Sequence, residues 1–450
     1  DYISLQSLKN RQDIRIQIRV FKEDKPEIFL VNYFDGSESK MEKLRSSEYF
    51  DYYYVDLNDV NYFKYYFKIN EGGRTLFYTR FGVTDYLKED TLFEYNKDFF
   101  LPDWAKGALM YQIFIDRFNR GDETNDVVDD EYIYIGLPVK HKENWDEYPS
   151  NFDVGYFYGG DLAGVLQKLD YLKDFGVEVI YFNPLFVSPS NHKYDTQDYD
   201  YIDPHIGVIV EDADGVLGED DTDNKNATKY VKRVTCKKNL EASNGLFIRL
   251  VEEAHKRNIK VIIDGVFNHC GSFNKWMDKE GIYKRAEDKY PIGAYWSKES
   301  EFRPYFNFIG NEYDGWWGHD TLPKLYYENS KKLIDEVLGI AKKWVSPPFN
   351  VDGWRLDVAA DLGYSHEFNH RFWAMFRSAV KSANKNAVIL AEHYGDPSFW
   401  LDGKCWDGVM NYDGFMEPVS WFLTGMEKHS DRAMPEKFGD GKLFFDAMRY

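Results

Sequence analysis

Cysteine is scarce in this chain, and the shortage excludes two ways of stabilising a fold. Only 3 of its 450 residues are cysteine, which is too few for a disulfide framework. Their spacing does not match the paired motifs that bind a structural metal ion. The three cysteines leave the redox compartment undecided, and they are Cys236, Cys270 and Cys405.

A long apolar run is also absent. No stretch approaches the roughly 18 residues of a membrane-spanning helix, so we expect no membrane span. No signal peptide is visible in the sequence. The chain begins at Asp1 rather than at methionine, and we therefore expect that a leader or an upstream region has been removed.

Positive charge is in deficit. The chain has 56 Lys and Arg residues against 76 Asp and Glu residues, which gives a formal net charge of −20. This balance argues against nucleic acid and anionic membrane surfaces as partners. It favours a neutral or cationic ligand and, above all, solubility.

Aromatic residues are what the chain has in surplus, at 18% of the sequence. Flat rings suit the apolar faces of sugar rings, so part of this surplus is expected to line a binding surface. Aromatic residues are also common in β-strands, so composition alone leaves the ligand open.

The first part of the chain reads as a β-sandwich over residues 1–98. Short segments of alternating or aromatic character follow one another, separated by turns such as residues 70–73. The pattern does not tell whether this domain binds a ligand, contacts another subunit or only packs. The expected strands include residues 14–20, 52–55, 62–69 and 75–78.

From residue 99 onward the pattern changes to strands that alternate with helices. Such a chain is too long for one core, and this rhythm is typical of a (β/α)8 barrel or a doubly wound sheet. Polar residues at the ends of apolar strands favour the barrel, whose active site lies at the carboxyl ends of its strands. The expected strands are 109–114, 177–184, 259–267, 351–358, 387–392 and 406–412, and the helices are 161–175, 243–255, 330–344 and 366–383.

Only six strands fit before Tyr450, so we expect an incomplete barrel whose last two strands lie beyond this chain. Asp161 and Ser243 are the expected N-caps of two helices, and Gly176 is an expected helix stop. An acidic insertion at 207–241 is expected to be an exposed loop. The expected ranges are 99–269 for the first part of the barrel, 270–330 for an aromatic inserted subdomain and 331–450 for the rest of the barrel.

Two strand ends carry the candidate chemistry. Arg355 and Asp357 are two residues apart in a strand, so they share a face, and the guanidinium would hold Asp357 as a carboxylate. Such a carboxylate is a candidate nucleophile, although a structural ion pair explains this strand equally well. Glu392 ends the next strand beside apolar residues, which would raise its pKa and suit a general acid. Two carboxylates on successive strands match the layout for glycoside hydrolysis.

Several motifs in the same order resemble the α-amylase family of glycoside hydrolases. Residues 264–269 (DGVFNH), 353–357 (GWRLD) and Glu392 resemble its first three signature regions. Residues 322–325 (LPKL) resemble an extra signature of its neopullulanase, cyclomaltodextrinase and amylopullulanase branch. Residues 111–114 and 190–196 match the same branch, and the strands at 66–69 and 77–78 resemble its N-terminal sandwich.

The resemblance implies roles for individual residues in a retaining mechanism. Asp357 would attack the anomeric carbon, Glu392 would act as acid and then as base, and Arg355 would hold Asp357 ionised. Tyr394 stands where this branch usually carries a tryptophan, so stacking on sugar would persist with less area. The substrate-binding residues implied are Tyr194, His192, His269, Asp264 and Tyr394.

A structural calcium ion is also implied by the resemblance. Two loops resemble the halves of a calcium cage, and their oxygen atoms are ligands that Ca²⁺ prefers. Arg120 departs from this pattern, because the branch typically has an Asn or Asp ligand there. The alternative is two ordinary turns, with Asp161 only capping its helix. The implied ligands are Asp122, Asn125, Asp126, the Gly159 carbonyl and Asp161.

The implied function is hydrolysis of α-1,4 and, as in amylopullulanases, α-1,6 glucosidic bonds in starch, pullulan or maltooligosaccharides. A cyclomaltodextrinase or glucanotransferase is the enzymatic alternative, and a glucan-binding or transporter-partner barrel is the non-enzymatic one. The presence of Arg355, Asp357 and Glu392 argues against the latter. The family's third catalytic carboxylate is expected beyond residue 450. We further expect a homodimer, and a bacterial protein that is secreted or held at the cell surface rather than cytoplasmic.

Overall fold

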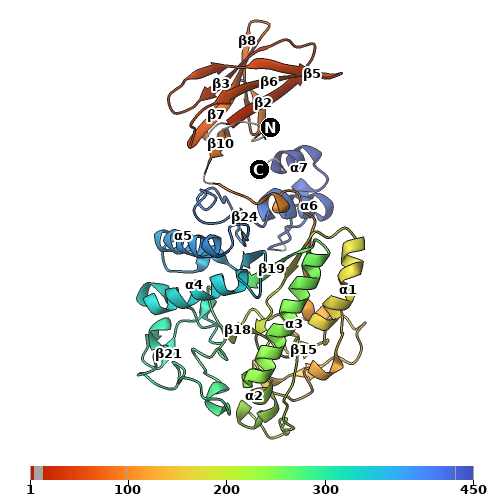
Figure 1. Cartoon of the computed structure of the whole chain (residues 1–450), viewed down its shortest axis with the longest axis vertical. Helices are drawn as coiled ribbons and strands as arrows, with labels where there is room; N and C mark the ends of the chain where they lie inside the picture. The colour runs from red at the N-terminus through yellow and green to blue at the C-terminus, as the bar shows by residue number, and fades with distance from the viewer. Residues whose placement is uncertain (1, 5–13, 98, 431, 449–450) are drawn as a thin grey trace. The chain divides into compact units, whose positions relative to one another are not determined.

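A computed structural model describes residues 2–4, 14–97, 99–430 and 432–448, which form two compact units (Figure 1). The sandwich unit comprises Asp1–Phe100, Tyr394–Gly403 and Asn411–Tyr450, and the barrel unit comprises Leu101–His393 and Lys404–Met410. In Figure 1 the strands of the sandwich unit are red and orange. The domain limits expected at residues 98, 269 and 330 stay predictions, and residue 98 itself lies outside the described residues.

The sandwich unit contains two β-sheets, as the sequence predicts. The first has the strand order β1-β2-β6-β5, and the second has the order β4-β3-β7-β8-β9 with β10 also paired to β7. The strands are β1 (Tyr2–Ser4), β2 (Ile14–Phe21), β3 (Glu27–Asn32), β4 (Glu38–Lys40), β5 (Glu42–Ser46), β6 (Phe50–Leu57), β7 (Tyr62–Glu71), β8 (Arg74–Thr79), β9 (Gly82–Thr84) and β10 (Phe93–Asn96).

The core of the sandwich comes from alternate residues of its strands. In β2 the side chains of Ile14, Ile16 and Ile18 are buried while the residues between them are more exposed, because successive side chains point to opposite faces. The tight turn between β7 and β8 is made by Gly72 and Gly73, which both have positive φ angles of 56° and 79°. This backbone conformation favours glycine in two-residue hairpins.

The sandwich unit also includes short helical segments from the end of the chain. They follow the single π-helical turn Tyr412–Met416, and Gly425, with φ 71°, ends the first of them. These helices are α6 (Glu417–Thr424) and α7 (Gly441–Ala447).

The barrel unit is organised around a six-stranded parallel sheet with the order β11-β16-β19-β22-β23-β24. Neighbouring strands are also successive strands of this sheet along the chain, and all five pairs are parallel. Every residue of β16 and β22 is buried, as expected for a parallel sheet covered on both faces. The strands are β11 (Met110–Ile113), β16 (Val179–Phe182), β19 (Lys260–Gly265), β22 (Gly353–Leu356), β23 (Val388–Ala391) and β24 (Gly408–Val409).

Helices connect these strands, except between β23 and β24. The six predicted barrel strands are confirmed, although the sixth, expected at 406–412, is only Gly408–Val409. The predicted helices over 161–175, 330–344 and 366–383 are confirmed to within one residue at each end. The helices of the barrel unit are α1 (Leu162–Asp174), α2 (Thr228–Thr235), α3 (Lys237–Lys256), α4 (Lys331–Val345) and α5 (His366–Ala383).

Smaller strands lie in the loops of this unit. They form three hairpins, and β14 pairs with β15 in parallel. These strands are β12 (Ile133–Tyr134), β13 (Leu137–Pro138), β14 (Lys140–His141), β15 (Tyr156–Phe157), β17 (Phe186–Val187), β18 (Asp198–Ile202), β20 (Phe308–Ile309) and β21 (Glu312–Tyr313).

The predicted helix ends have different outcomes. Asp161 caps α1, since its carboxylate accepts a hydrogen bond from the Gly164 amide at 2.5 Å, and Gly176 follows the helix with φ 91°. The prediction that Ser243 begins a helix is wrong, because α3 starts at Lys237. The Ser243 hydroxyl is buried inside this helix and donates to the Asn239 carbonyl at 2.8 Å. Lys237, Lys238 and Glu241, which precede Ser243 in this helix, are exposed, whereas Asn239 is buried.

The acidic insertion at 207–241 is more ordered than the expected exposed loop, so that prediction is wrong in part. It contains α2 and the start of α3, and Tyr230 and Val234 of α2 lie in a core cluster with Leu217. The many acidic residues suggested an exposed loop, and the sequence does not show that basic residues of α2 pair with them. The buried Arg233 guanidinium donates to Asp212 at 2.8 Å and to Glu131 at 2.9 Å.

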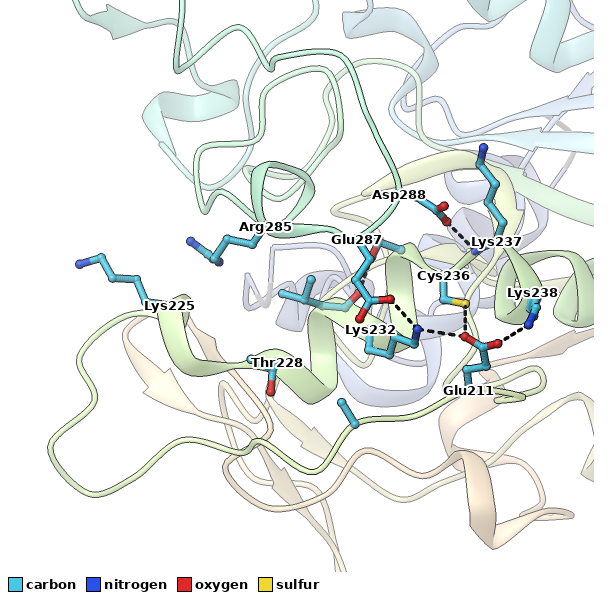
Figure 2. A pocket seen from close by; sticks show the side chains of 13 residues that line it. Glu211, Lys225, Thr228, Lys232, Cys236, Lys237, Lys238, Arg285, Glu287 and Asp288 are labelled. Atoms are coloured by element: carbon cyan, nitrogen blue, oxygen red, sulfur yellow. Dashed lines mark hydrogen bonds and ion pairs between the residues drawn. The ribbon is translucent and has the colours of Figure 1, made fainter.

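The insertion borders a cavity of about 590 Å³ that is lined by acidic and basic side chains (Figure 2). Figure 2 shows that these charges pair with one another: Glu211 binds Lys238, and its other oxygen lies 2.9 Å from the Lys232 ammonium. Lys232 also lies 2.8 Å from Glu287. Glu211, Lys232, Lys238 and Glu287 in the lining are therefore already paired with one another.

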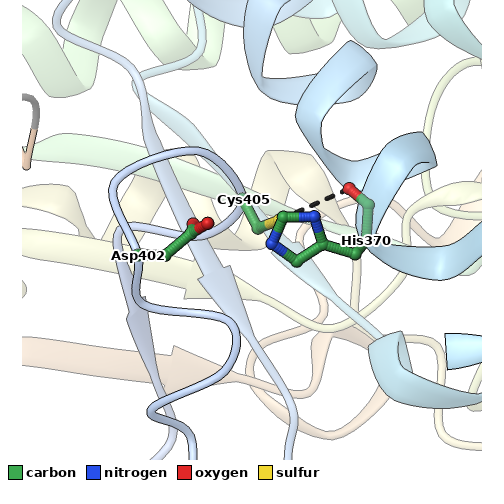
Figure 3. Close-up of side chains that lie close together, drawn as sticks. All are labelled: His370, Asp402 and Cys405. Carbon is green, nitrogen blue, oxygen red and sulfur yellow. Dashed lines mark hydrogen bonds between the residues drawn. The ribbon is translucent and has the colours of Figure 1, made fainter. Parts of the chain in front are cut away.

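The three cysteines form no disulfide bond. Cys270 and Cys405 are buried, and the Cys405 thiol donates to the His370 carbonyl at 3.4 Å (Figure 3). Within the described ranges, none of the helices combines the length and the apolar character required to cross a bilayer.

Candidate active site

Arg355 lies at the centre of the candidate site, at the carboxyl edge of the parallel sheet. One of its terminal nitrogens, Nη1, donates to both carboxylate oxygens of Asp264, at 3.1 and 3.0 Å, and to Asp357 Oδ1 at 2.9 Å. The other, Nη2, lies 2.9 Å from Glu392 Oε2. The four residues come from β19, β22 and the end of β23, and the register of these strands places Asp264 beside Arg355. The structure therefore brings the three predicted catalytic residues together.

These groups are shielded from water. Asp264, Arg355 and Asp357 are 1%, 4% and 9% exposed. Burial raises the pKa of Asp357, the neighbouring Asp264 and Glu392 add to this, and Arg355 opposes it. Burial tends to lower the pKa of the Arg355 guanidinium, but the surrounding carboxylates outweigh it and raise that pKa. The arginine therefore stays charged among the three carboxyl groups.

Asp264 is held by hydroxyl groups as well as by Arg355. Its Oδ2 atom accepts hydrogen bonds from the Tyr181 hydroxyl at 2.6 Å and from the Tyr194 hydroxyl at 3.1 Å. Asn183 in turn donates to the Tyr194 hydroxyl at 2.9 Å. These contacts bind Asp264 firmly to the strand ends. They place the predicted substrate residue Tyr194 beside Asp264.

The backbone after Asp357 is strained. Val358 has φ 35°, a left-handed conformation that is unfavourable for a β-branched residue. In this conformation the Val358 amide donates to Glu392 Oε2 at 2.9 Å. Residues held in such conformations cluster at functional sites, because the surrounding structure must compensate for the strain. The strained turn thus fixes Glu392 next to Asp357.

The predicted substrate residues His192 and His269 are neutral in their surroundings. Burial lowers the pKa of His192, whose ring accepts a hydrogen bond from the Tyr194 amide at 3.1 Å. Burial, and then the charge on Lys324, lower the pKa of His269 to about 3. The His269 ring stacks on Trp316, with ring centroids 4.8 Å apart and planes at 7°.

Tyr394, the remaining predicted substrate residue, belongs to the sandwich unit. Its ring is 41% exposed and stacks on Tyr412, with ring centroids 4.5 Å apart. Its role on sugar stays a prediction.

Other contacts at this edge were not foreseen from the sequence. Tyr181 lies within an apolar strand that gives no sign of a polar role. The ammonium of Lys324 binds the Asn268 side chain and the Asp361 carbonyl, and burial lowers its pKa to about 8. Only the motif around residues 322–325 marked this lysine, without indicating its partners.

The predicted calcium ligands lie close together but do not fit a calcium cage as they are arranged. Asp161 already accepts backbone hydrogen bonds from Gly121, Asp122 and Gly164. The Asp126 carboxylate binds the Arg120 guanidinium. The side-chain oxygen of Asn125 and one oxygen of Asp126 are buried without a hydrogen-bond partner, which is the only feature that favours a cation. A bound calcium ion stays a prediction.

A parallel sheet with acidic groups gathered on an arginine at its carboxyl edge defines a barrel-type active site. Two family descriptions match the chain. "Alpha amylase, catalytic domain" matches residues 112–217 and 243–435, and "Alpha amylase, N-terminal ig-like domain" matches residues 3–101. The chain belongs to the α-amylase family. The unmatched residues 218–242 between the two catalytic ranges overlap the insertion at 207–241 in all but the last residue.

Three curated relatives agree with this assignment. An amylopullulanase of Thermoanaerobacter thermohydrosulfuricus is 36% identical over 390 residues, which cover 77% of this chain and 23% of that protein. A cyclomaltodextrinase of Thermoanaerobacter pseudethanolicus is 33% identical and covers 90% of this chain and 62% of its own length. Neopullulanase 2 of Thermoactinomyces vulgaris is 32% identical, with 93% and 63% covered. The chain therefore spans less than two thirds of each of these relatives.

Solved structures share the fold. A cyclomaltodextrinase structure has a TM-score of 0.55 and 28% identity, and the match covers 92% of this chain and 63% of that one. The type III pullulan hydrolase from Thermococcus kodakarensis has a TM-score of 0.62 at 22% identity, with 97% and 67% covered. The barrel with an N-terminal sandwich predicted from the sequence is confirmed.

Proposed function

We propose that the protein is a retaining glycoside hydrolase that cleaves α-1,4 and α-1,6 glucosidic bonds in starch, pullulan or maltooligosaccharides. The observation that carries the proposal is the contact of one buried guanidinium with both Asp357 and Glu392. Membership of the α-amylase family supports it, and so do the names amylopullulanase and neopullulanase among the relatives.

The residues divide the reaction into two displacements. Asp357 bonds to the anomeric carbon as the glycosidic bond breaks, and Glu392 gives its proton to the leaving oxygen. Glu392 then takes a proton from water, whose oxygen bonds to the anomeric carbon and releases Asp357. Arg355 stabilises Asp357 as a carboxylate when it attacks and when it leaves.

The charge balance of the cluster disfavours full ionisation of all three carboxyl groups. Three carboxylates around one guanidinium would leave a net charge of −2 in a buried place, so the cluster retains a proton more firmly than exposed carboxyl groups would. The raised pKa values of Asp264 and Asp357 reflect this.

The test is Glu392→Gln, with Asp357→Asn as a second variant. Each should lower the rate of maltooligosaccharide hydrolysis by about 10²-fold or more while substrate binding persists. Glu178→Gln is the control, because Glu178 precedes β16 at the amino edge of the same sheet and is exposed. Unchanged hydrolysis by Glu392→Gln would contradict the proposal.

A cyclomaltodextrinase or glucanotransferase is the second candidate, because the cyclomaltodextrinase relative covers 90% of this chain. In that case cyclodextrin, or a sugar acceptor in place of water, would be preferred. Product analysis on starch, pullulan and cyclodextrin separates these activities. A homodimer and a location outside the cytoplasm stay predictions, to be measured by light scattering and by cell fractionation.

A further inference from the structure

Arg120 is the basic partner of a buried carboxylate in the loop that precedes α1. Its guanidinium binds Asp126, whose side chain is only 8% exposed, and also lies 3.5 Å from Glu123. Burial raises the pKa of Asp126, and Arg120 opposes this shift. Arg120 is therefore the positive charge that lies against this buried carboxyl group.

The same pair packs against the second loop of the predicted calcium site. Gly159 has φ 83°, and a Cβ atom there would collide with Asp126 Oδ1 and lie 3.2 Å from Arg120 Nε. Only glycine leaves room for the guanidinium and the carboxylate at this point. The arginine side chain thus lies against both Asp126 and Gly159, two of the residues expected to hold calcium.

Asp161 is satisfied without a cation. Its Oδ1 atom accepts from the Gly121 amide at 3.1 Å and from the Gly164 amide at 2.5 Å, and its Oδ2 atom accepts from the Asp122 amide at 2.7 Å. The Asn125 side chain donates to the same carboxylate at 3.3 Å. These donors already connect the loop at 121–125 to the start of α1.

We infer that Arg120 takes the place of the divalent cation, so that a guanidinium of this chain joins the two loops and no calcium is needed there. One positive charge is enough to join the two loops, because backbone amides already donate hydrogen bonds to the Asp161 carboxylate. The inference concerns stability and metal binding only. It therefore holds or fails separately from the proposed hydrolase activity.

The decisive measurement is the Tm of the protein in EDTA and in millimolar CaCl₂, with bound metal determined by elemental analysis. The wild type should have the same Tm in both and contain no stoichiometric calcium. Arg120→Asn removes the charge and introduces an amide oxygen, so its Tm should fall by several degrees in EDTA and recover in CaCl₂. Arg257→Asn is the matched control, since Arg257 pairs with Asp170 at 2.7 Å elsewhere in the barrel unit, and its Tm should not respond to calcium.

A wild type that loses stability in EDTA would overturn the inference, and so would an Arg120→Asn variant whose Tm ignores calcium. If Arg120→Asn does not fold, Arg120→Lys provides the second measurement. Lysine keeps the positive charge, so the Tm of this variant should remain independent of calcium. A calcium-dependent Tm for Arg120→Lys would overturn the inference as well.

Discussion

Arg355 shows how much of the site depends on one side chain. Its guanidinium contacts carboxylates from three neighbouring strand ends, at distances of 2.9 to 3.1 Å. A planar group with several donors can do this, whereas a lysine ammonium on a flexible stem cannot match the same geometry. The positions of the Asp357 and Glu392 carboxyl groups therefore depend on the Arg355 guanidinium between them.

His269 provides a pH test at the scale of one residue. The pKa of His269 is about 3 in the folded protein, below the usual value near 6.5. Between these two pH values the imidazole is protonated in the unfolded chain but not in the folded protein. The free energy of unfolding should then decrease as the pH falls, by about 1.4 kcal/mol per pH unit from this group. His269→Gln should remove this part of the slope between pH 6.5 and pH 4.5, measured by urea unfolding. Equal slopes for both proteins would contradict the pKa assignment.

Site residues that lie in recognisable sequence motifs at strand ends could be predicted. Site residues without such a position in the sequence could not. Arg355, Asp357 and Glu392 could be found because strand periodicity and the ends of strands determine where they point. Tyr181 could not, because a tyrosine in an apolar strand is usually only part of a core. Lys324 could not be placed either, since its contact with Asn268 depends on how the long segment after β19 folds back.

The segment between β20 and α4 is the element that most resembles a sugar-binding surface. Trp317 is 79% exposed and has φ 52°, and its ring lies 5.0 Å from that of Trp316, which stacks on His269. A left-handed backbone at a bulky residue is uncommon, and such strained residues cluster at functional sites. We therefore expect this segment to extend the candidate site beyond the carboxylates.

Trp317→Ala tests this extension. In a Glu392→Gln background, which prevents hydrolysis, the variant should bind maltoheptaose roughly three- to tenfold more weakly, because one ring–sugar contact is lost. Trp317→Tyr should restore most of the affinity. Isothermal titration calorimetry measures both. An unchanged affinity for Trp317→Ala would show that this ring does not contact the glucan.

The elements themselves were predicted well where one pattern dominates. Helix α5 agrees with its prediction because a serine cap and a continuous helical pattern coincide. The start of α3 was missed because α3 follows α2 directly at Cys236, without a side-chain cap. The insertion was predicted to be an exposed loop because of its many acidic residues. The sequence does not show that buried Arg233 pairs with Glu131 and Asp212.

For the whole molecule, the absence of disulfide bonds gives a simple prediction. Reductant should leave the Tm unchanged to within about 1 °C, because no cross-link restricts the unfolded chain. In the folded protein a thiol reagent should label Cys236 first, since Cys270 and Cys405 are buried and burial raises the pKa of the Cys270 thiol. All three should react in urea. A Tm that falls in reductant would reveal a cross-link.

The order of the parallel sheet has a consequence for biosynthesis. Each strand pairs with the strand before it in this sheet, so Met110 pairs with Val179, and Ile262 later pairs with Gly353. The ribosome delivers the strands in the order in which the sheet adds them, from β11 to β24. The edge strand of the growing sheet cannot pair until the long connection and the next strand have been translated. Pairing between strands so far apart in sequence is slow. During that time the newest edge is exposed to other nascent chains, so chaperone demand should be highest while the sheet is being extended.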